Sequence, residues 1–278
     1  MKELLQYHRP QSMYDSEVHN FITEILSSKE NFANDPDNLW LEFKEKFHNW
    51  IMNSKLNIAN GLDEFQDRDI IVGVTQFIDD IYQSKKNVKV LPNEYKYHWR
   101  MYGDSNTLDN YYSLKPGDNL IISTPFPYNG NIHTEMNSIL DWSYERAVDV
   151  HIDACWWGCS RDLTFNFDHP AIQSIGFSLS KALGLGANRI GLRYCRKRWV
   201  GPVTLHNEFN MCNQILVWMG IKFIDRFGSD FWWKKYGDVY YQMCSDLNLT
   251  PTKAIHLAYD NDKPVGVRPI LRKMFNER

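Results

Sequence analysis

The sequence lacks the features typical of membrane proteins, disulfide-bonded secreted proteins and nucleic-acid-binding proteins. No apolar stretch approaches the roughly 20 residues needed to span a bilayer. The N-terminus has no long apolar region of the kind found in a signal peptide. A formal net charge of −3 gives no indication of an anionic partner, and the five cysteines form no paired framework, which favours a reducing compartment. We therefore expect a cytoplasmic protein with no nucleic-acid or membrane partner.

Metal-binding and repeat patterns are also missing. Cys155 and Cys159 are four residues apart, but no second cysteine pair or matched histidines complete a zinc site, so we expect no metal. The chain shows no internal repeat, low-complexity tract or flexible linker. Its 278 residues are enough for one large domain with appendages around a substantial core.

The sequence does contain an alternation of β-prone and helical stretches. Residues 1–60 carry apolar residues at helical spacing and predict an N-terminal helical segment. Residues 61–200 indicate an α/β domain, in which helices cover both faces of a mostly parallel sheet. Residues 201–278 predict two helices and then a short C-terminal unit with weak strands. The β-prone runs lie at 88–91, 118–123, 147–153, 172–178 and 190–194.

Lys181 is the most informative residue. It follows an apolar run and completes a Ser-x-Ser-Lys pattern with Ser178 and Ser180, and the pair Arg189 and Gly191 follows as Arg-x-Gly. A lysine at the end of a buried strand is costly unless its amine is paired, neutralised or bound covalently. A covalent bond to an aldehyde removes that cost and gives the lysine a chemical role.

Asp153 is a second candidate, because it ends the β-prone run that begins at Ala147. A strand of this kind delivers its last side chain to the C-terminal edge of a parallel sheet, where open α/β folds place their sites. The spacing from Asp153 to Lys181 suits one strand, a connection and a second strand.

These residues resemble the cofactor motifs of pyridoxal-phosphate (PLP) enzymes of fold type I, the aspartate aminotransferase-like superfamily. The resemblance covers residues 70–200 and implies a three-layer αβα fold with a mostly parallel seven-stranded sheet and a reduced C-terminal small domain. It implies that Lys181 holds the PLP aldehyde as a Schiff base and that Asp153 pairs with the pyridinium nitrogen. It further implies that Ser178 and Arg189 bind the phosphate and that Ser180 also contacts the cofactor.

Further motifs extend the resemblance. A Gly-x-Thr turn opens an amphipathic run, and backbone N–H groups at a helix start bind phosphate well. The cofactor residues that it implies are Gly73, Val74, Thr75 and Gln76.

A strand followed by Pro and aromatic residues resembles the segment that stacks on the pyridine ring. Tyr95 is the expected stacking residue, with Tyr97 and His98 as alternatives. Further on, a Pro-rich turn stands where the family usually has Asn-Pro-Thr-Gly. Asn129 is expected to take the role of that asparagine toward the phenolic oxygen, although Pro127 could occupy its place.

The chain also departs from the family pattern. Trp156 stands where many aminotransferases have a tyrosine on the cofactor, and an indole N–H can donate but cannot accept or ionise. The substrate carboxylate has Arg268 and Arg272 as C-terminal candidates, neither in a recognisable motif. The basic run over residues 193–198 is expected to be a solvated turn.

The resemblance implies a PLP-dependent aminotransferase that moves an amino group between an amino acid and a 2-oxo acid, with Lys181 as the general base. The shared core does not determine which bond breaks, so a PLP-dependent lyase or decarboxylase is an alternative. A non-catalytic binding or regulatory relative is another. The resemblance also implies a homodimer with composite sites, which fits the amphipathic N-terminal segment and the ten tryptophans.

Overall fold

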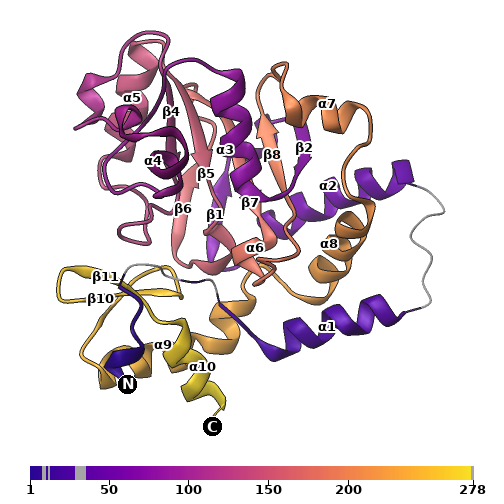
Figure 1. Ribbon diagram of the computed structural model, residues 1–278, viewed down its shortest axis with the longest axis vertical. Helices are drawn as coiled ribbons and strands as arrows, with labels where there is room; N and C mark the ends of the chain where they lie inside the picture. The colour runs from indigo at the N-terminus through magenta and orange to yellow at the C-terminus, as the bar shows by residue number, and fades with distance from the viewer. Residues whose placement is uncertain (8–10, 12, 29–35, 277–278) are drawn as a thin grey trace.

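A six-stranded sheet forms the centre of the protein (Figure 1). The computed structural model describes residues 1–7, 11, 13–28 and 36–276, so parts of the predicted N-terminal helical segment lie outside the described residues. Each of the five predicted β-prone runs coincides with or overlaps one strand of this sheet. In spatial order the strands are β2 (Asp67–Ile71), β8 (Gly191–Cys195), β7 (Ile172–Ser178), β5 (Asp149–Asp153), β4 (Asn119–Ser123) and β3 (Val88–Val90).

Five of the six strands run in the same direction, so their carboxyl ends meet at one edge. Strands β3, β4, β5 and β7 pair in parallel, whereas β8 is antiparallel to both β7 and β2. The register places Ser123 beside Asp153, and it places both Ile71 and Ser178 beside Gly191. The segments that leave β2, β4, β5 and β7 therefore converge at the edge where α/β folds place their sites.

The structure corrects the predicted number of strands from seven to six. Beyond β3, within the described chain, a single parallel bridge joins Val90 to Thr107, and the Leu108 N–H donates to the Val90 carbonyl at 2.9 Å. Residues 106–110 read Asn-Thr-Leu-Asp-Asn and contain one large apolar residue. A buried parallel strand needs a nearly continuous apolar run, so this segment forms a bridge and no strand.

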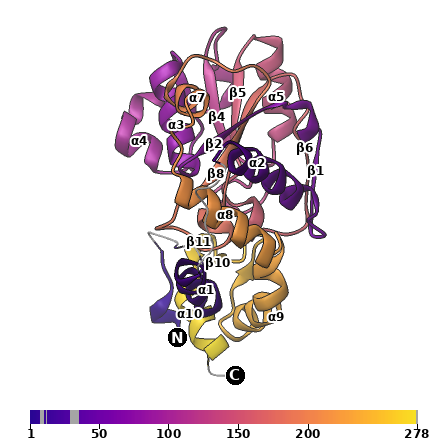
Figure 2. The same cartoon turned by 90° about the vertical axis from the view of Figure 1, so that its right-hand side faces the viewer.

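Helices cover both faces of the sheet, which confirms the predicted three-layer αβα architecture (Figure 2). Along β4 the side chains alternate: Ile121 belongs to the core beneath α3 (Gly73–Ser84), and Leu120 and Ile122 belong to the core on the other face. The α3 face also carries α4 (Tyr97–Tyr102) and α7 (Pro202–Glu208), and the opposite face carries α2 (Pro36–Met52) and α5 (Met136–Glu145).

The two ends of the chain meet in the lower part of Figure 1. Gln6 exchanges two backbone hydrogen bonds of 2.9 Å with Gly266, which joins the N-terminus to the C-terminal strands. The elements of this part are α1 (Ser16–Ser27), α8 (Gln214–Arg226), α9 (Phe231–Asp246), α10 (Arg268–Asn276) and the antiparallel strands β9 (Thr250–Pro251), β10 (Leu257–Asp260) and β11 (Lys263–Gly266).

The remaining elements are short. Strands β1 (Asn57–Asn60) and β6 (Leu163–Asn166) form a separate parallel pair, and α6 (Leu179–Ala182) follows β7. The 3₁₀ turns are Lys2–Leu4, Leu62–Glu64, Asp104–Asn106, Tyr111–Ser113 and Trp157–Cys159. Among the helices of the described residues, none has the length and apolar character needed to cross a membrane.

The basic run that begins within β8 corrects another expectation, because its first residue is not solvated. Arg193 is fully buried and donates to Asp80 at 2.7 Å, to Asp69 at 2.5 Å and to Thr204 at 2.7 Å. Arg193 lies within β8, where side chains point alternately to the two faces of the sheet, and it faces these partners beneath α3. Arg198 is part-exposed and pairs with Asp69 at 2.7 Å.

Candidate active site

A narrow pocket of about 20 Å³ opens at the carboxyl ends of β4 and β5. The parallel register brings Ser123 and Asp153 to this edge together, and α6 brings Lys181. The turn after β3 adds Tyr95, and the turn after β5 adds Trp156. The complete lining is Tyr95, Ser123, Pro125, Pro127, Asp153, Cys155, Trp156 and Lys181.

The amine of Lys181 faces two aromatic rings. Its Nζ lies 4.9 Å from the ring centre of Trp156 and 5.3 Å from that of Tyr95. Burial lowers the pKa of Lys181, but the acidic groups around it, Cys155 first and then Tyr95 and Asp153, raise the pKa above its ordinary value. Burial raises the pKa of the Cys155 thiol to about 12, so at neutral pH the Asp153 carboxylate is the partner that carries the charge.

Asp153 ends β5 and is 5% exposed. Its Oδ1 accepts a hydrogen bond from the Cys155 N–H at 2.9 Å. Burial raises the pKa of Asp153, while that hydrogen bond and the positive charges of Lys181 and Arg189 oppose the rise. The site thus holds a carboxylate whose charge depends on nearby cations.

A second group of residues forms a cradle beside this pocket. The Arg189 Nη2 donates to the Thr75 Oγ1 at 2.6 Å, while the Arg189 Nε is buried without a hydrogen-bond partner. Gly73 has φ +73°, and a Cβ there would lie 2.9 Å from the Arg189 Nε and 3.3 Å from the Ser180 Oγ. Only glycine leaves this space open. Donors from three segments therefore face one small volume.

The start of α3 contributes to the same cradle. Its N-cap residue, Val72, makes no side-chain capping bond, and the Val72 N–H donates to the Gln76 Oε1 at 2.6 Å. The Val74 side chain packs in the core beneath α3. Orphan N–H groups at the start of a helix favour an anion.

The Ser178 hydroxyl bonds within its own turn and to the adjacent backbone, and it does not face Gly73 as the Ser180 hydroxyl does. The Ser178 hydroxyl accepts the Ser180 N–H at 3.0 Å, which caps α6, and it lies 2.8 Å from the Ser180 Oγ. It also donates to the Ile190 carbonyl at 3.2 Å. The serine that faces Gly73 and Arg189 is Ser180.

The structure separates the three aromatic candidates. Tyr95 lines the pocket, and the Tyr97 hydroxyl donates to Asp79 at 2.8 Å. His98 is fully buried, its Nδ1 lies 3.2 Å from the Tyr82 hydroxyl, and burial lowers its pKa to about 4.

The predicted asparagine lies outside the pocket lining. The Asn129 Oδ1 accepts the Asn131 N–H at 2.9 Å, which makes Asn129 a residue of its own turn. Pro125 and Pro127 line the pocket in this region.

Three residues near the site were not anticipated from the sequence. Ser123 lines the pocket at the end of β4, and the buried Glu94 bonds to it. His256, from the C-terminal unit, packs edge-on against Trp156 with ring centres 4.3 Å apart. A polar residue that ends a strand is a usable signal for Ser123, whereas His256 lies about 100 residues from Trp156 in the sequence and shows no local pattern.

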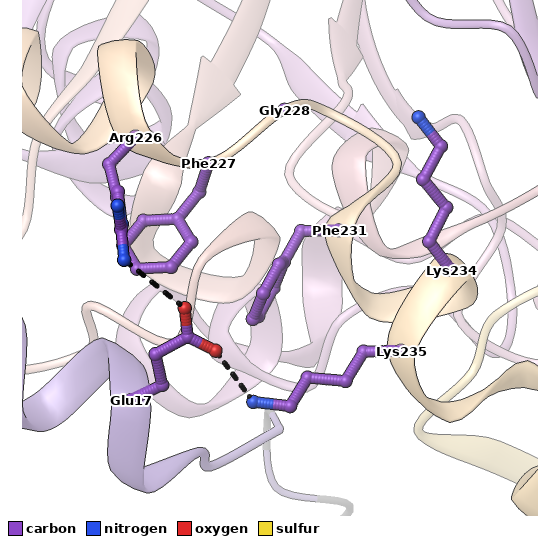
Figure 3. A pocket seen from close by; sticks show the side chains of 7 residues that line it. All are labelled: Glu17, Arg226, Phe227, Gly228, Phe231, Lys234 and Lys235. Atoms are coloured by element: carbon purple, nitrogen blue, oxygen red, sulfur yellow. Dashed lines mark hydrogen bonds and ion pairs between the residues drawn. The ribbon is translucent and has the colours of Figure 1, made fainter.

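A larger cavity of about 390 Å³ lies elsewhere, between α1, the end of α8 and the start of α9 (Figure 3). Glu17 accepts Lys235 at 2.9 Å and pairs with Arg226 at 3.9 Å, and Lys234 pairs with Asp230 at 3.7 Å. The charged side chains that line this cavity are therefore largely paired with other residues of the chain, unlike Lys181 and Asp153 in the pocket at the carboxyl ends of β4 and β5.

Comparisons with known proteins identify the fold. No protein-family model and no curated sequence matches the chain. Among solved structures, a PLP-bound C-S lyase from Staphylococcus hominis is 14% identical, with a TM-score of 0.64 over 99% of this chain and 87% of that chain. Tyrosine aminotransferase from Leishmania infantum is 12% identical, with a TM-score of 0.62 over 91% of this chain and 81% of that chain.

A probable N-succinyldiaminopimelate aminotransferase from Thermus thermophilus is also similar, at 12% identity and a TM-score of 0.61 over 98% of this chain and 92% of that chain. At these identities the likeness concerns the fold. The chain has the three-layer fold of the PLP-dependent enzymes of fold type I, as the sequence predicted.

Proposed function

We propose that the protein is a PLP-dependent aminotransferase, which transfers an amino group between an amino acid and a 2-oxo acid. The observation that carries the proposal is the convergence of Lys181 and Asp153 in one pocket, beside a cradle formed by Gly73, Thr75 and Arg189. These residues offer an amine for the aldehyde of PLP, a carboxylate for its ring nitrogen and a guanidinium for its phosphate.

The residues present fit the cofactor. Arg189, Thr75, Ser180 and the first N–H groups of α3 would hold the phosphate, because the Arg189 Nε is buried without a partner and a dianion would satisfy it. Ser178 supports this turn by capping α6. Asp153 would hold the ring nitrogen, with Tyr95 and Trp156 beside the ring. The open volume is about 20 Å³, so side chains of the pocket lining would have to move to admit the ring.

When bound, PLP supplies an aldehyde for amines and a ring that withdraws electrons from the substrate α-carbon. Asp153 keeps a negative charge at the ring nitrogen, aided by the nearby positive charges of Lys181 and Arg189. Lys181 would hold the aldehyde, and its Nζ would carry the α-proton once the amine of the substrate had displaced it. Burial lowers the pKa of Lys181 and the acidic groups around it raise the pKa above its ordinary value, so pairing Asp153 with another cation would remove part of that rise.

Arg268 is the proposed partner of the substrate carboxylate. It begins α10 and is half-buried, and both burial and the charge of Arg272 lower its pKa. Arg272 instead lies 4.2 Å from the ring centre of Tyr14.

A PLP-dependent lyase is the second candidate, because a C-S lyase is among the similar structures. The two reactions differ in their products. An aminotransferase passes the amino group to a 2-oxo acid, and a lyase acting on a sulfur-containing amino acid releases a thiol. Assays for both products with the same panel of amino acids distinguish them.

We also propose a homodimer that works in the cytoplasm, with each site completed by the neighbouring chain. Val72 (45% exposed) and Met211 (66%) line a pocket together with Gln76 and Arg189, which supports a partner there, and Leu205 (43%), Phe209 (67%) and Ile215 (44%) are exposed on the same stretch of chain as Met211. All five cysteines are free, as a reducing compartment requires. Light scattering of PLP-loaded protein tests the dimer, and a monomer of about 33 kDa contradicts it.

Borohydride reduction followed by peptide mapping tests the central proposal. The reagent fixes PLP irreversibly on the amine that holds it, and the label should be found on Lys181. Lys235 is the matched control, because it is also part-buried but is paired with Asp15 and Glu17. A label on any lysine other than Lys181 contradicts the assignment.

A further inference from the structure

A buried carboxylate next to the pocket has no role in the steps above. Glu94 lies in the turn between β3 and α4 and is 3% exposed. Burying a charge without a cation is costly, so such a residue needs a physical explanation.

Three hydrogen bonds hold the Glu94 carboxylate. Its Oε1 accepts the Ser123 N–H at 2.6 Å, and its Oε2 accepts the Ser123 hydroxyl at 2.7 Å and the Tyr95 N–H at 3.0 Å. Ser123 and Tyr95 both line the pocket. Glu94 therefore connects two walls of the pocket that come from different strands.

Glu94 also lies close to the other carboxylate of the site. Ser123, which holds Glu94, is the register partner of Asp153 across β4 and β5. Burial raises the pKa of Glu94 to about 7 against the three hydrogen bonds, and the Asp153 charge adds to the rise. The two carboxylates therefore disfavour each other's charge.

The other groups that face Glu94 are neutral near pH 7. Tyr82, on α3, has its pKa raised by burial and by the Glu94 charge. His98, on α4, lies 3.2 Å from the Tyr82 hydroxyl, and its pKa is lowered to about 4. In the described part of the chain no cation forms an ion pair with Glu94, so Asp153 is its charged neighbour.

We propose that Glu94 is a positioning residue that orders Tyr95 and Ser123 and, by keeping or losing its proton, sets how strongly Asp153 holds a positive partner. When Glu94 is ionised, its negative charge favours a cation at Asp153. When Glu94 is protonated, that support is lost. The second half of this inference rests on the proposed function, because PLP is the cation-bearing partner that would respond.

The first experiment measures the proton on Glu94 in the full chain without added PLP. The free energy of unfolding of wild type and Glu94→Gln is determined by denaturant titration from pH 5 to pH 8. The pKa of Glu94 in the folded state, about 7, lies above the ordinary value of 4.5. Stability of the wild type relative to Glu94→Gln should therefore fall as pH rises toward 7 and then level off.

Two further variants make this experiment specific. In an Asp153→Asn background the same fall should occur at lower pH, since the neighbouring charge is gone. Glu64→Gln, at an exposed glutamate, should show no pH-dependent difference from the wild type. The proposal is overturned if the difference in unfolding free energy between wild type and Glu94→Gln does not change with pH. It is also overturned if the fall in stability occurs at the same pH in the Asp153→Asn background.

The second experiment measures the dissociation constant of PLP by absorbance at each pH. The ratio of the dissociation constants of Glu94→Gln and wild type should be near one at pH 5.5 and rise above one as the pH passes 7, because only ionised Glu94 supports a cation at Asp153. A constant ratio overturns the effect of Glu94 on the cofactor. If neither protein binds PLP at any pH, the proposed function fails, while the stability curves still decide whether Glu94 and Asp153 are coupled.

Discussion

Two charged regions of the molecule lie on β8 and in the turn just before it, and they differ in how their charges are satisfied. On β8, the Arg193 guanidinium donates to Asp69, Asp80 and Thr204 and is fully buried. At the sheet edge, Arg189 bonds to a neutral hydroxyl and keeps a buried Nε without a partner. Both arginines keep a buried Nε without a hydrogen-bond partner, but two carboxylates of the chain itself match the charge of Arg193, whereas the partner of Arg189 among the described residues is a hydroxyl.

The same contrast applies to the three buried acids nearby. Asp69 and Asp80 are paired with Arg193, while Asp153 has Lys181 in its pocket without a close ion pair among the described residues. A charge paired inside the fold holds elements together, and a charge left unpaired is available for binding or proton transfer. Variants in the first region should therefore lose stability, whereas variants in the second should lose cofactor binding or turnover.

The largest effect is expected at Lys181. Lys181→Ala should lower turnover by about 1,000-fold or more, because the general base is lost. Its free energy of unfolding should stay within about 1 kcal/mol of the wild type, since no close ion pair is broken. Absorbance changes with a panel of amino acids and denaturant unfolding measure the two quantities. A strongly destabilised variant would show that Lys181 is part of the structural scaffold.

Asp153→Ala should weaken PLP binding and lower turnover by about 100-fold or more, because the charge at the ring nitrogen is removed. The pKa of Asp153 is raised in the folded state, so its charge opposes folding above the ordinary pKa. The variant should therefore be at least as stable as the wild type at pH 7.

Asp141→Ala is the matched control for this variant, because its exposed carboxylate pairs with His169. It should leave turnover unchanged. Near-normal turnover in Asp153→Ala would remove Asp153 from the site.

Arg193→Met should lower the free energy of unfolding and should not act on turnover directly. It leaves the buried carboxylates of Asp69 and Asp80 without their cation, which costs about 3–5 kcal/mol. Arg196→Met is the control, since Arg196 and its partner Asp168 are part-exposed, and its loss should be about 1 kcal/mol. If denaturant unfolding shows the same loss of stability for Arg193→Met and Arg196→Met, the buried ion pair is worth no more than the exposed one.

The smallest effect is expected for Arg189→Lys. A lysine keeps the charge but loses the parallel N–H groups, so the dissociation constant of PLP should rise about tenfold, or about 1.4 kcal/mol. Arg226→Lys, at an exposed arginine beside the cavity in Figure 3, should leave PLP binding unchanged. Unchanged affinity in Arg189→Lys would separate Arg189 from the phosphate.

Much of the fold could be predicted from local pattern. Apolar runs identified β3, β4, β5, β7 and β8, and apolar residues at helical spacing identified α1, α2, α8 and α9. The short pair β1 and β6 was missed, because each strand has four residues and pairs across about 100 positions. The seventh strand was expected from the resemblance, and the polar segment 106–110 cannot form it.

The sequence by itself determined which residues leave each strand at the carboxyl edge, because period-two burial and the strand ends are local properties. Lys181, Asp153 and the turn at Gly73 could therefore be identified from the amino-acid sequence alone. Only the tertiary structure decided that Ser180 faces the cradle, that Asn129 folds into its own turn, and that Arg193 is buried. Glu94 likewise depends on the pairing of β3, β4 and β5, since its partner Ser123 is 29 positions away. Such choices follow from which side chains meet across the sheet, and local sequence carries no signal for that.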